Sequence, residues 1–389
     1  MAVTTRTTDP SGIIPMEAYH GHHIGQRSPW KKWIMNQGVP IHTGVSLYDM
    51  YTTPVSDWGE TGAKAAMLNF ETGEMSDAWL IEVPPGGQVK PIHHMFDKMV
   101  YVVTGRGATS VWTIGSKKKQ TFEWQKGSIF GIPLNAWHEF YNGSGSEPAR
   151  LICVTSAPLA MNFNPDHNFL FNNTATFPHI YNGEEGYFSS EGKPLEGRLW
   201  RSNFNADVRT FPVETMRYRG AGGTNRHFDM GSTHFNAHIS EFPSGTYKKG
   251  HRHGPGAHLI TLEGSGYTLE WNWGKELVEF PWKDGTCYTA LNGFWHQHFN
   301  TGKKPVRYLA ITHGRYHLSL RARPAEQGES AANVAHHGDE MDYEEEEPWI
   351  REKYRGECAK NGVTVDDYKM TKEYELSLPT DSWRKEDWT

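Results

Sequence analysis

The sequence contains an internal repeat, and this repeat restricts the chain to folds in which one structural unit occurs twice. The stretch from Glu82 to Gly107 has a second copy from Glu241 to Gly266. Further downstream, the segment that begins at Gly127 matches the segment that begins at Gly285. The matched pairs include Pro84 with Pro243, Gly86 with Gly245, His94 with His253, Gly105 with Gly264, Trp137 with Trp295, His138 with His296 and Asn142 with Asn300. Both copies are therefore expected to fold alike.

Each copy has the pattern of a β-rich unit. Short apolar runs such as MVYVVTG and HLITLEG are bounded by glycine and proline, and closely spaced short strands favour an antiparallel sandwich or barrel. We predict an all-β chain of two tandem jelly-roll barrels with a short C-terminal helical tail. The predicted divisions are an N-terminal extension (1–39), a first barrel (40–160), a connector (161–204), a second barrel (205–318) and an acidic tail with a docking helix (319–389).

The tail contains one predicted helix. An acidic run, 339–347, precedes Pro348, which opens the segment PWIREKYRGECAKNG. Proline suits the first helical turn, and Asn361-Gly362 is a typical helix stop. One face is apolar and consists of Ile350, Tyr354 and Cys358. We expect this helix to dock on a barrel or on a second subunit, whereas 325–347 fits a solvated acidic tail equally well.

Composition excludes several classes of protein. The chain has 389 residues, of which 37% are hydrophobic and 22% charged, as in soluble globular proteins. It has no apolar run long enough to span a membrane and no secretory signal. A formal net charge of −6 argues against nucleic acid as a partner. Three widely spaced cysteines fit a reducing cytoplasm.

Three histidines of the second copy form a predicted metal site. His251 and His253 are two residues apart, so on a strand both side chains point to the same side. His296 comes from a later strand of the same unit. Three neutral imidazoles suit Fe, Ni, Cu or Zn. His298 lies two residues beyond His296 and is a candidate to orient a ligating histidine or to substitute as a ligand.

The first copy departs from this pattern. Its aligned positions hold Ile92, His94, Lys98 and His138, so only two imidazoles remain and a cation lies beside them. We therefore favour a metal-free first barrel that serves structure and subunit contacts. A degenerate site stays open as the alternative, made of His93, His94, Asp97 and His138.

Other side chains are candidates for a substrate pocket in the second barrel. His238 and Asn236 share a strand face. Arginine can grip a carboxylate with two parallel hydrogen bonds, and aromatic rings can flank a flat substrate. The arginine candidates are Arg226, Arg252 and Arg307, and the aromatic candidates are Trp271, Tyr288 and Trp295. Each also has an ordinary structural interpretation as a core residue or surface ion pair.

The two copies resemble the cupin superfamily. Gly245, His251, His253 and Gly264 match its first motif, and His296 with Asn300 matches the second. The motif glutamate is replaced by Ala257. The segments HRHGPGAHLITLEGSGYT and GFWHQHFNTG resemble gentisate dioxygenase-like bicupins, although in those enzymes the first barrel typically carries the motif. This resemblance implies two cupin barrels, one metal ion per chain and a homodimer or homotetramer.

The predicted function is a non-haem Fe(II) dioxygenase. A three-histidine site leaves positions for dioxygen and for a small aromatic or enol-like acid that chelates through adjacent oxygens. Mn, Ni, Cu and Zn are alternative metals. The alternative function keeps the metal without dioxygen chemistry, as in a decarboxylase, isomerase or lyase, although the missing glutamate counts against acid–base catalysis. A non-enzymatic binding cupin is the third hypothesis.

Overall fold

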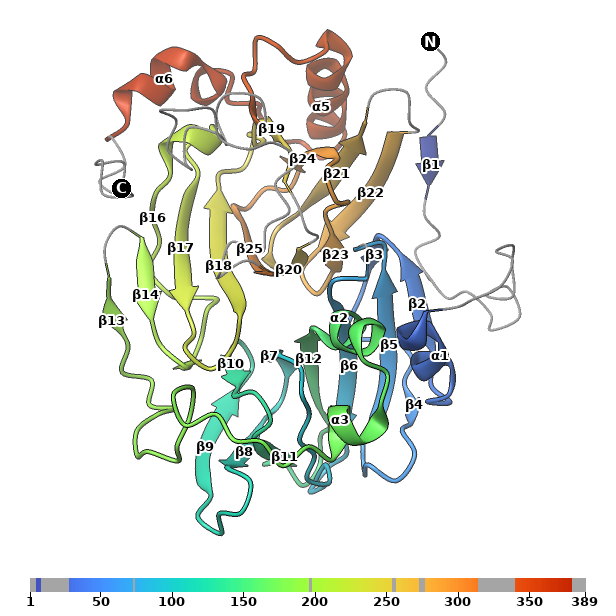
Figure 1. The fold of residues 1–389 in the computed structure, drawn as a ribbon. Helices are drawn as coiled ribbons and strands as arrows, with labels where there is room; N and C mark the ends of the chain where they lie inside the picture. Colours follow the sequence, from blue (N-terminus) through green and yellow to red (C-terminus); the bar gives the residue numbers. More distant parts are fainter. Residues whose placement is uncertain are drawn as a thin grey trace, which may run out of the picture.

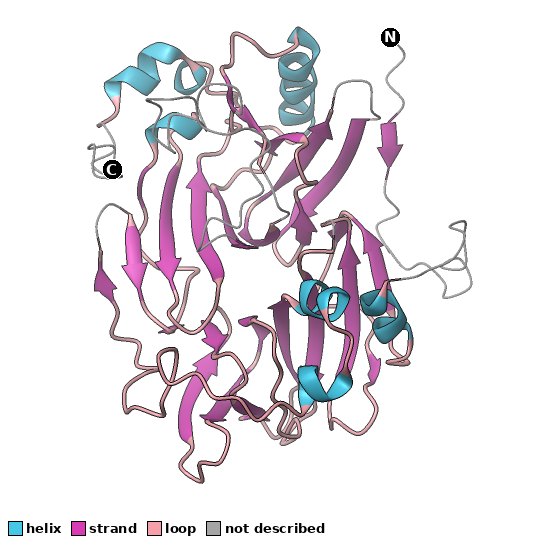
Figure 2. Ribbon diagram, viewed as in Figure 1, coloured by secondary structure: helices cyan, strands magenta, loops and turns pink. Residues whose placement is uncertain are grey.

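We analysed a computed structural model of the chain. It describes residues 5–7, 28–72, 74–195, 198–253, 257–272, 277–313 and 340–379. Most of the predicted N-terminal extension, residues 314–318 of the predicted second barrel, and residues 319–339 and 380–389 of the predicted tail lie outside these described residues. Strands dominate the described chain (Figure 2). None of its described helices is both long and apolar enough to cross a membrane.

The first barrel is built from one large and one small sheet. Its strands are β2 (Ile41–Gly44), β4 (Ser56–Asp57), β5 (Lys64–Phe70), β6 (Asp77–Val83), β7 (Lys98–Thr104), β8 (Arg106–Trp112), β9 (Gln120–Gln125), β10 (Ile129–Ile132), β11 (Trp137–Asn142), β12 (Ala149–Thr155) and β15 (Phe204–Asn205). The large sheet has the order β15-β10-β7-β12-β6-β5-β2, with β4 paired to β5, and the small sheet has the order β11-β8-β9. Its interior is apolar and includes Trp79, Phe130 and Phe140.

The second barrel has the same plan (Figure 1). Its strands are β1 (Thr5–Thr7), β3 (Ser46–Leu47), β13 (Lys193–Pro194), β14 (Leu199–Arg201), β16 (Glu214–Thr215), β17 (Thr224–Asp229), β18 (Phe235–Phe242), β19 (Gly250–His251), β20 (His258–Glu263), β21 (Ser265–Trp271), β22 (Leu277–Lys283), β23 (Cys287–Thr289), β24 (Trp295–Asn300), β25 (Val306–His313) and β26 (Glu340–Met341). One sheet has the order β13-β14-β17-β18-β25-β20-β23-β3, with β16 paired to β17. The other has the order β1-β22-β21-β24-β19-β26.

The strand pairings of the two barrels correspond. The order β10-β7-β12-β6-β5 in the first barrel matches β23-β20-β25-β18-β17 in the second, and β11-β8-β9 matches β24-β21-β22. The prediction of two tandem jelly-roll barrels is therefore confirmed. The repeated sequence positions encode one strand order twice.

The barrels also exchange strands. β3, from the start of the first unit, pairs with β23 of the second barrel, while β15 from the end of the connector pairs with β10 of the first. A shared apolar cluster joins their large sheets, with Leu80 and Ile152 on one side and Ile239 and Leu309 on the other. The predicted divisions at 40–160 and 205–318 therefore do not separate the sheets completely.

Helices lie at the periphery. They are α1 (Pro29–Met35), α2 (Ala157–Phe163), α3 (His167–Phe171), η2 (Arg217–Arg219), α5 (Pro348–Lys360), η3 (Tyr368–Met370) and α6 (Lys372–Ser377). The predicted docking helix is confirmed as α5, which ends at the C-cap Asn361. Its Ile350, Tyr354 and Cys358 are buried in a cluster with Tyr247 and Phe299 of the second barrel. The tail therefore packs on this barrel, beside β19 and β24 (Figure 1).

The motif asparagine has the same structural role in both barrels. The side-chain amide of Asn142 donates to the carbonyl oxygens of Val83, Pro84 and Glu147. Asn300 likewise donates to Pro243 and Lys304, at 3.1 and 2.9 Å, and is fully buried. Each asparagine thus ties the end of its own strand, β11 or β24, to two loops.

We expect Asn300→Ala to destabilise the fold by roughly 1–3 kcal/mol, because it leaves buried backbone carbonyls without donors. Chemical unfolding measures this change, and Asn142→Ala is the matched variant in the other barrel. Both should lose stability, and Asn300→Ala should keep its metal affinity. Loss of metal binding by Asn300→Ala at unchanged stability would contradict this structural role.

Candidate metal centre

Three imidazoles converge in the second barrel. β19 pairs with β24 so that His251 lies directly opposite His296, and His298 follows two residues later on the same face of β24. One ring nitrogen from each of the three lies within 4.8 Å of those of the other two. All three side chains are buried. Among the described residues, they form the one group of histidine, cysteine or acidic side chains close enough together to hold a metal ion.

Hydrogen bonds fix the orientation of these rings. The Nδ1 atom of His251 donates to the carbonyl oxygen of Lys249 at 2.9 Å, and that of His296 donates to Phe294 at 3.2 Å. A carbonyl oxygen only accepts, so Nε2 of both rings carries the lone pair. His298 Nδ1 is hydrogen-bonded to Thr268 Oγ1 at 2.9 Å. This arrangement fits a metal, because ligating histidines are usually held through their second nitrogen.

The protonation states also suit a metal. Burial lowers the pKa of His251 and His296 well below the usual value, and neighbouring positive charges add to this effect. Burial and the charge of Lys248 lower the pKa of His298 to about 3. All three rings are therefore neutral near pH 7, which is the form that binds metal.

His253, the third predicted ligand, lies beside this group. Its ring centroid is 4.8 Å from that of His296 and 5.8 Å from that of His251. Its side chain is half-buried, unlike the other three. By ring-nitrogen distances His298 completes the closest set. By ring centroids His253 is the nearer, since the His298 ring lies 5.5 Å from that of His296 and 6.0 Å from that of His251. The ligand set His251, His253 and His296 therefore stays a prediction beside it.

Two carboxyl groups flank the histidines, and the sequence had not suggested either. Glu270 on β21 lies directly opposite His296, and Glu340 on β26 lies directly opposite His251. Directly opposed residues project from the same face of a sheet. Glu270, His296, His251 and Glu340 therefore form one row across four strands. We call this row the carboxyl–histidine row.

Both carboxyl groups of the row are shielded from water. Burial raises the pKa of Glu270 to about 8 and that of Glu340 to about 7. Glu270 is fully buried, and its Oε2 accepts a hydrogen bond from the Leu291 amide. Among the described residues, Oε1 of Glu270 has no hydrogen-bond partner. Glu270 thus holds an available carboxyl oxygen in the barrel interior.

Two cations also lie near the centre. Lys248 is buried, and its Nζ donates to Ser240 Oγ at 3.0 Å. Arg219, at the end of η2, is close enough that its charge contributes to the low pKa values of His251, His296 and His298. Neither residue belongs to a recognisable motif, so the sequence alone gave no signal for them. Together they bring positive charge to an interior that also holds the carboxyl groups of Glu270 and Glu340.

Three of the other predicted pocket residues lie on the inner side of the second barrel. Tyr288 lies beside the centre, with its ring 5.7 Å from His298. His238 faces the same interior, since its ring is 6.4 Å from that of Tyr308, which in turn lies 5.7 Å from His298. Asn236 shares the face of His238 on β18.

The predicted tryptophans occupy the outer face of the same sheet. Trp271 and Trp295 lie opposite each other on β21 and β24. Trp295 is one residue from His296, so it points to the other face. Trp271 packs against the cluster beneath α5. The structure therefore places both rings behind the metal centre and outside its interior.

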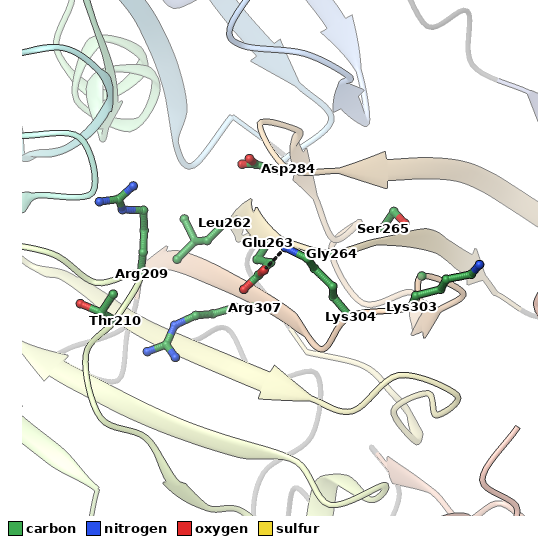
Figure 3. Close-up of a pocket in the computed structure, with 11 residues that line it drawn as sticks. Arg209, Thr210, Leu262, Glu263, Gly264, Ser265, Asp284, Lys303, Lys304 and Arg307 are labelled. Carbon is green, nitrogen blue, oxygen red and sulfur yellow. Dashed lines mark hydrogen bonds and ion pairs between the residues drawn. The ribbon is translucent and has the colours of Figure 1, made fainter. Parts of the chain in front are cut away.

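The predicted arginines have other partners. Arg226 forms an ion pair with Glu214, and the Arg252 guanidinium lies 5.1 Å from the Trp295 ring centroid. Arg307 pairs with Glu241 and lines a crevice of about 560 Å³. No histidine of the centre lines this crevice, and most of its charged groups are already paired, as Lys304 is with Glu263 (Figure 3).

In the first barrel a lysine takes the corresponding place. Lys98 is buried, and its Nζ donates to Nε2 of His138 at 2.8 Å. It also lies 4.9 Å from the Trp79 ring centroid. His94 donates through Nδ1 to the Phe96 carbonyl oxygen, and its ring is 5.2 Å from that of His138. The ammonium group therefore uses the nitrogen with which His138 would bind a metal.

His93 and Asp97, the other two members of the alternative first-barrel site, have partners elsewhere. His93 is hydrogen-bonded to Asn135 at 2.8 Å and packs on Trp137. Asp97 interacts with His234 of the second barrel at 3.0 Å. The four side chains do not form a group that could hold a metal among the described residues. The metal-free first barrel stays a prediction.

Comparison with known proteins agrees with the fold. Residues 79–155 match the cupin domain family. The second barrel repeats the strand order of this segment.

Similar solved structures include oxalate decarboxylase of Bacillus subtilis. One mutant is 14% identical, with a TM-score of 0.49, over 72% of this chain and 80% of that chain. A tryptophan-to-tyrosine variant is 12% identical over the same shares, with a TM-score of 0.48. Another structure, 14% identical over 72% and 80% of the chains with a TM-score of 0.49, concerns the Mn(II) centres of that enzyme. No curated protein matches the chain. The resemblance to gentisate dioxygenases stays a prediction.

Lys98 leads to a testable pH dependence of stability. Burial lowers its pKa to about 8 from the usual 10.5. Between these values the unfolded chain holds a proton that the folded chain has lost, so stability rises with pH by up to about 3 kcal/mol. Lys98→Met should abolish this rise and be the more stable protein at pH 7.

Chemical unfolding of both proteins between about pH 7 and pH 10.5 measures this difference. The exposed Lys64→Met is the matched control and should behave as the wild type does. If the free energies of unfolding of the wild type and Lys98→Met differed by the same amount at every pH in this range, the buried ammonium would be ruled out as the cause.

Proposed function

We propose that the chain is a mononuclear metalloenzyme that acts on a small chelating carboxylic acid without consuming dioxygen, as a decarboxylase, isomerase or lyase. The observation that carries this proposal is the carboxyl–histidine row. The sequence showed no side chain for acid–base catalysis, because Ala257 replaces the motif glutamate. Glu270 and Glu340 supply carboxyl groups beside the histidines from other strands.

His251, His296 and His298 would hold the metal, with His253 as a fourth imidazole beside His296. Bound Mn, Zn or Ni would supply a Lewis acid that polarises a substrate oxygen. The Lys249 and Phe294 carbonyls keep the imidazoles oriented. Glu270 holds a carboxyl group in the dry interior, where it can exchange a proton with a bound substrate.

The charge near the centre supports an acidic substrate. Lys248 and Arg219 bring positive charge to a site whose histidines are neutral. Cations beside a buried site attract an anion, and low dielectric strengthens this attraction. A small carboxylate with a second oxygen for chelation has the matching chemistry.

A non-haem Fe(II) dioxygenase is the second candidate. It is favoured by the all-imidazole ligand set, which adds no negative charge to the metal and leaves coordination positions open. Tyr288 and Tyr308 near His298 would suit an aromatic or enol-like acid. Cytoplasmic location and assembly into a homodimer or homotetramer remain predictions.

Metal content and oxygen dependence test the proposal. We expect about one metal ion per chain by elemental analysis, and none in His251→Ala, because an imidazole of the centre is lost. Turnover of a panel of small dicarboxylic and hydroxy acids should proceed anaerobically at the aerobic rate. Stoichiometric oxygen uptake would favour the dioxygenase, and absence of metal from the wild type would reject both enzymes.

Glu270→Gln tests the carboxyl group itself. It keeps size and polarity but removes the group that transfers a proton, so we expect kcat to fall by roughly 10²–10⁴-fold with metal content unchanged. Glu263→Gln, an exposed change on β20, is the matched control and should keep its activity. Wild-type kcat in Glu270→Gln would exclude Glu270 from the reaction.

A further inference from the structure

The C-terminal tail contacts both strands that carry the candidate ligands. β26 adds to the edge of β19, and this pairing sets Glu340 opposite His251. The following residues pass over the outer face of the same sheet. We call residues 340–346 the strap. Its buried side chains include Tyr343 and Glu346.

The strap reaches His296 and His298 through Gln297. This residue lies between the two histidines and projects to the opposite face of β24. It is fully buried, and its Nε2 donates to Glu346 Oε2 at 3.1 Å. The other oxygen of Glu346 accepts hydrogen bonds from the Tyr247 hydroxyl and from Arg351. Glu346 is therefore a buried junction behind the centre.

The strap reaches His251 through Lys249. The backbone carbonyl of Lys249 accepts the Nδ1 hydrogen of His251 and orients its ring. The Lys249 ammonium forms ion pairs with Asp342 of the strap and with Glu375 of α6. The Tyr343 hydroxyl donates to the backbone carbonyl of Tyr247, two residues earlier, at 2.6 Å. The segment before His251 is thus held by the tail at two points.

We propose that the strap positions the three metal-ligating histidines, with Glu346 as its main positioning residue. This inference rests on the metal centre of the proposed function. The carboxylate of Glu346 fixes β24 between its two ligands, while Tyr343 and Asp342 fix the segment that carries His251. Metal affinity therefore depends on a part of the chain that supplies none of these imidazoles. Partners behind ligating residues typically change metal affinity 10- to 100-fold.

Mn(II) binding to the full chain tests the strap. Glu346→Gln preserves shape but replaces one acceptor oxygen with a donor that opposes the Gln297 amide. We expect the Kd for Mn(II) to rise about 10-fold and the Mn(II) electron paramagnetic resonance spectrum to change. Glu344→Gln is the matched control, because Glu344 is an exposed strap residue of the same charge. It should bind Mn(II) as the wild type does.

The outcomes separate the strap from the metal centre. Wild-type affinity and spectrum in Glu346→Gln would overturn the strap while leaving the centre intact. If the wild type bound neither Mn(II) nor the other divalent metals, the proposed metal centre itself would be rejected. If Glu346→Gln does not fold, Tyr343→Phe decides: it removes one hydroxyl from the strap, and an unchanged Kd and spectrum would overturn the proposal.

Discussion

The register of four strands sets the chemistry of the second barrel. Because β24 lies between β21 and β19 with His296 opposite both Glu270 and His251, two imidazoles and two carboxyl groups share one face. Side chains alternate along a strand, so a slip of one residue in β24 would turn His296 and His298 to the outer face. The short strand β19 makes this register depend on its neighbours, and β26 supplies pairing on its open side.

The two barrels share one fold but fill the same interior position with different side chains. In the first barrel, Val111 lies opposite His138, whereas the second has Glu270 opposite His296. Lys98 fills the space beside His138 with a cation that belongs to the chain. A fixed ammonium satisfies one imidazole nitrogen but offers no exchangeable coordination position. The first barrel therefore shares the fold of the second but holds an ammonium group where the second holds the candidate ligands.

Local patterns in the sequence predicted a large part of this structure. The repeat predicted both barrels, and the spacing of Ile350, Tyr354 and Cys358 predicted the docking helix. The motif positions pointed to His251 and His296. Contacts between distant segments were not predictable in this way. Glu340 reaches the centre only because β26 pairs with β19, and β3 and β15 cross between barrels. The phase of one strand also decides whether Trp295 or His296 faces inward, and composition does not reveal that phase.

The position of the carboxyl groups explains how the chain can depart from the cupin pattern at Ala257. A glutamate of the motif would come from the strand that follows the first two histidines. Here Ala257 is buried in an apolar cluster, where a charged group would be costly without a partner. Glu270 and Glu340 enter instead from the two sides of the histidine strands. The chemistry of the site thus belongs to a sheet assembled from distant segments, and the tail is part of that sheet.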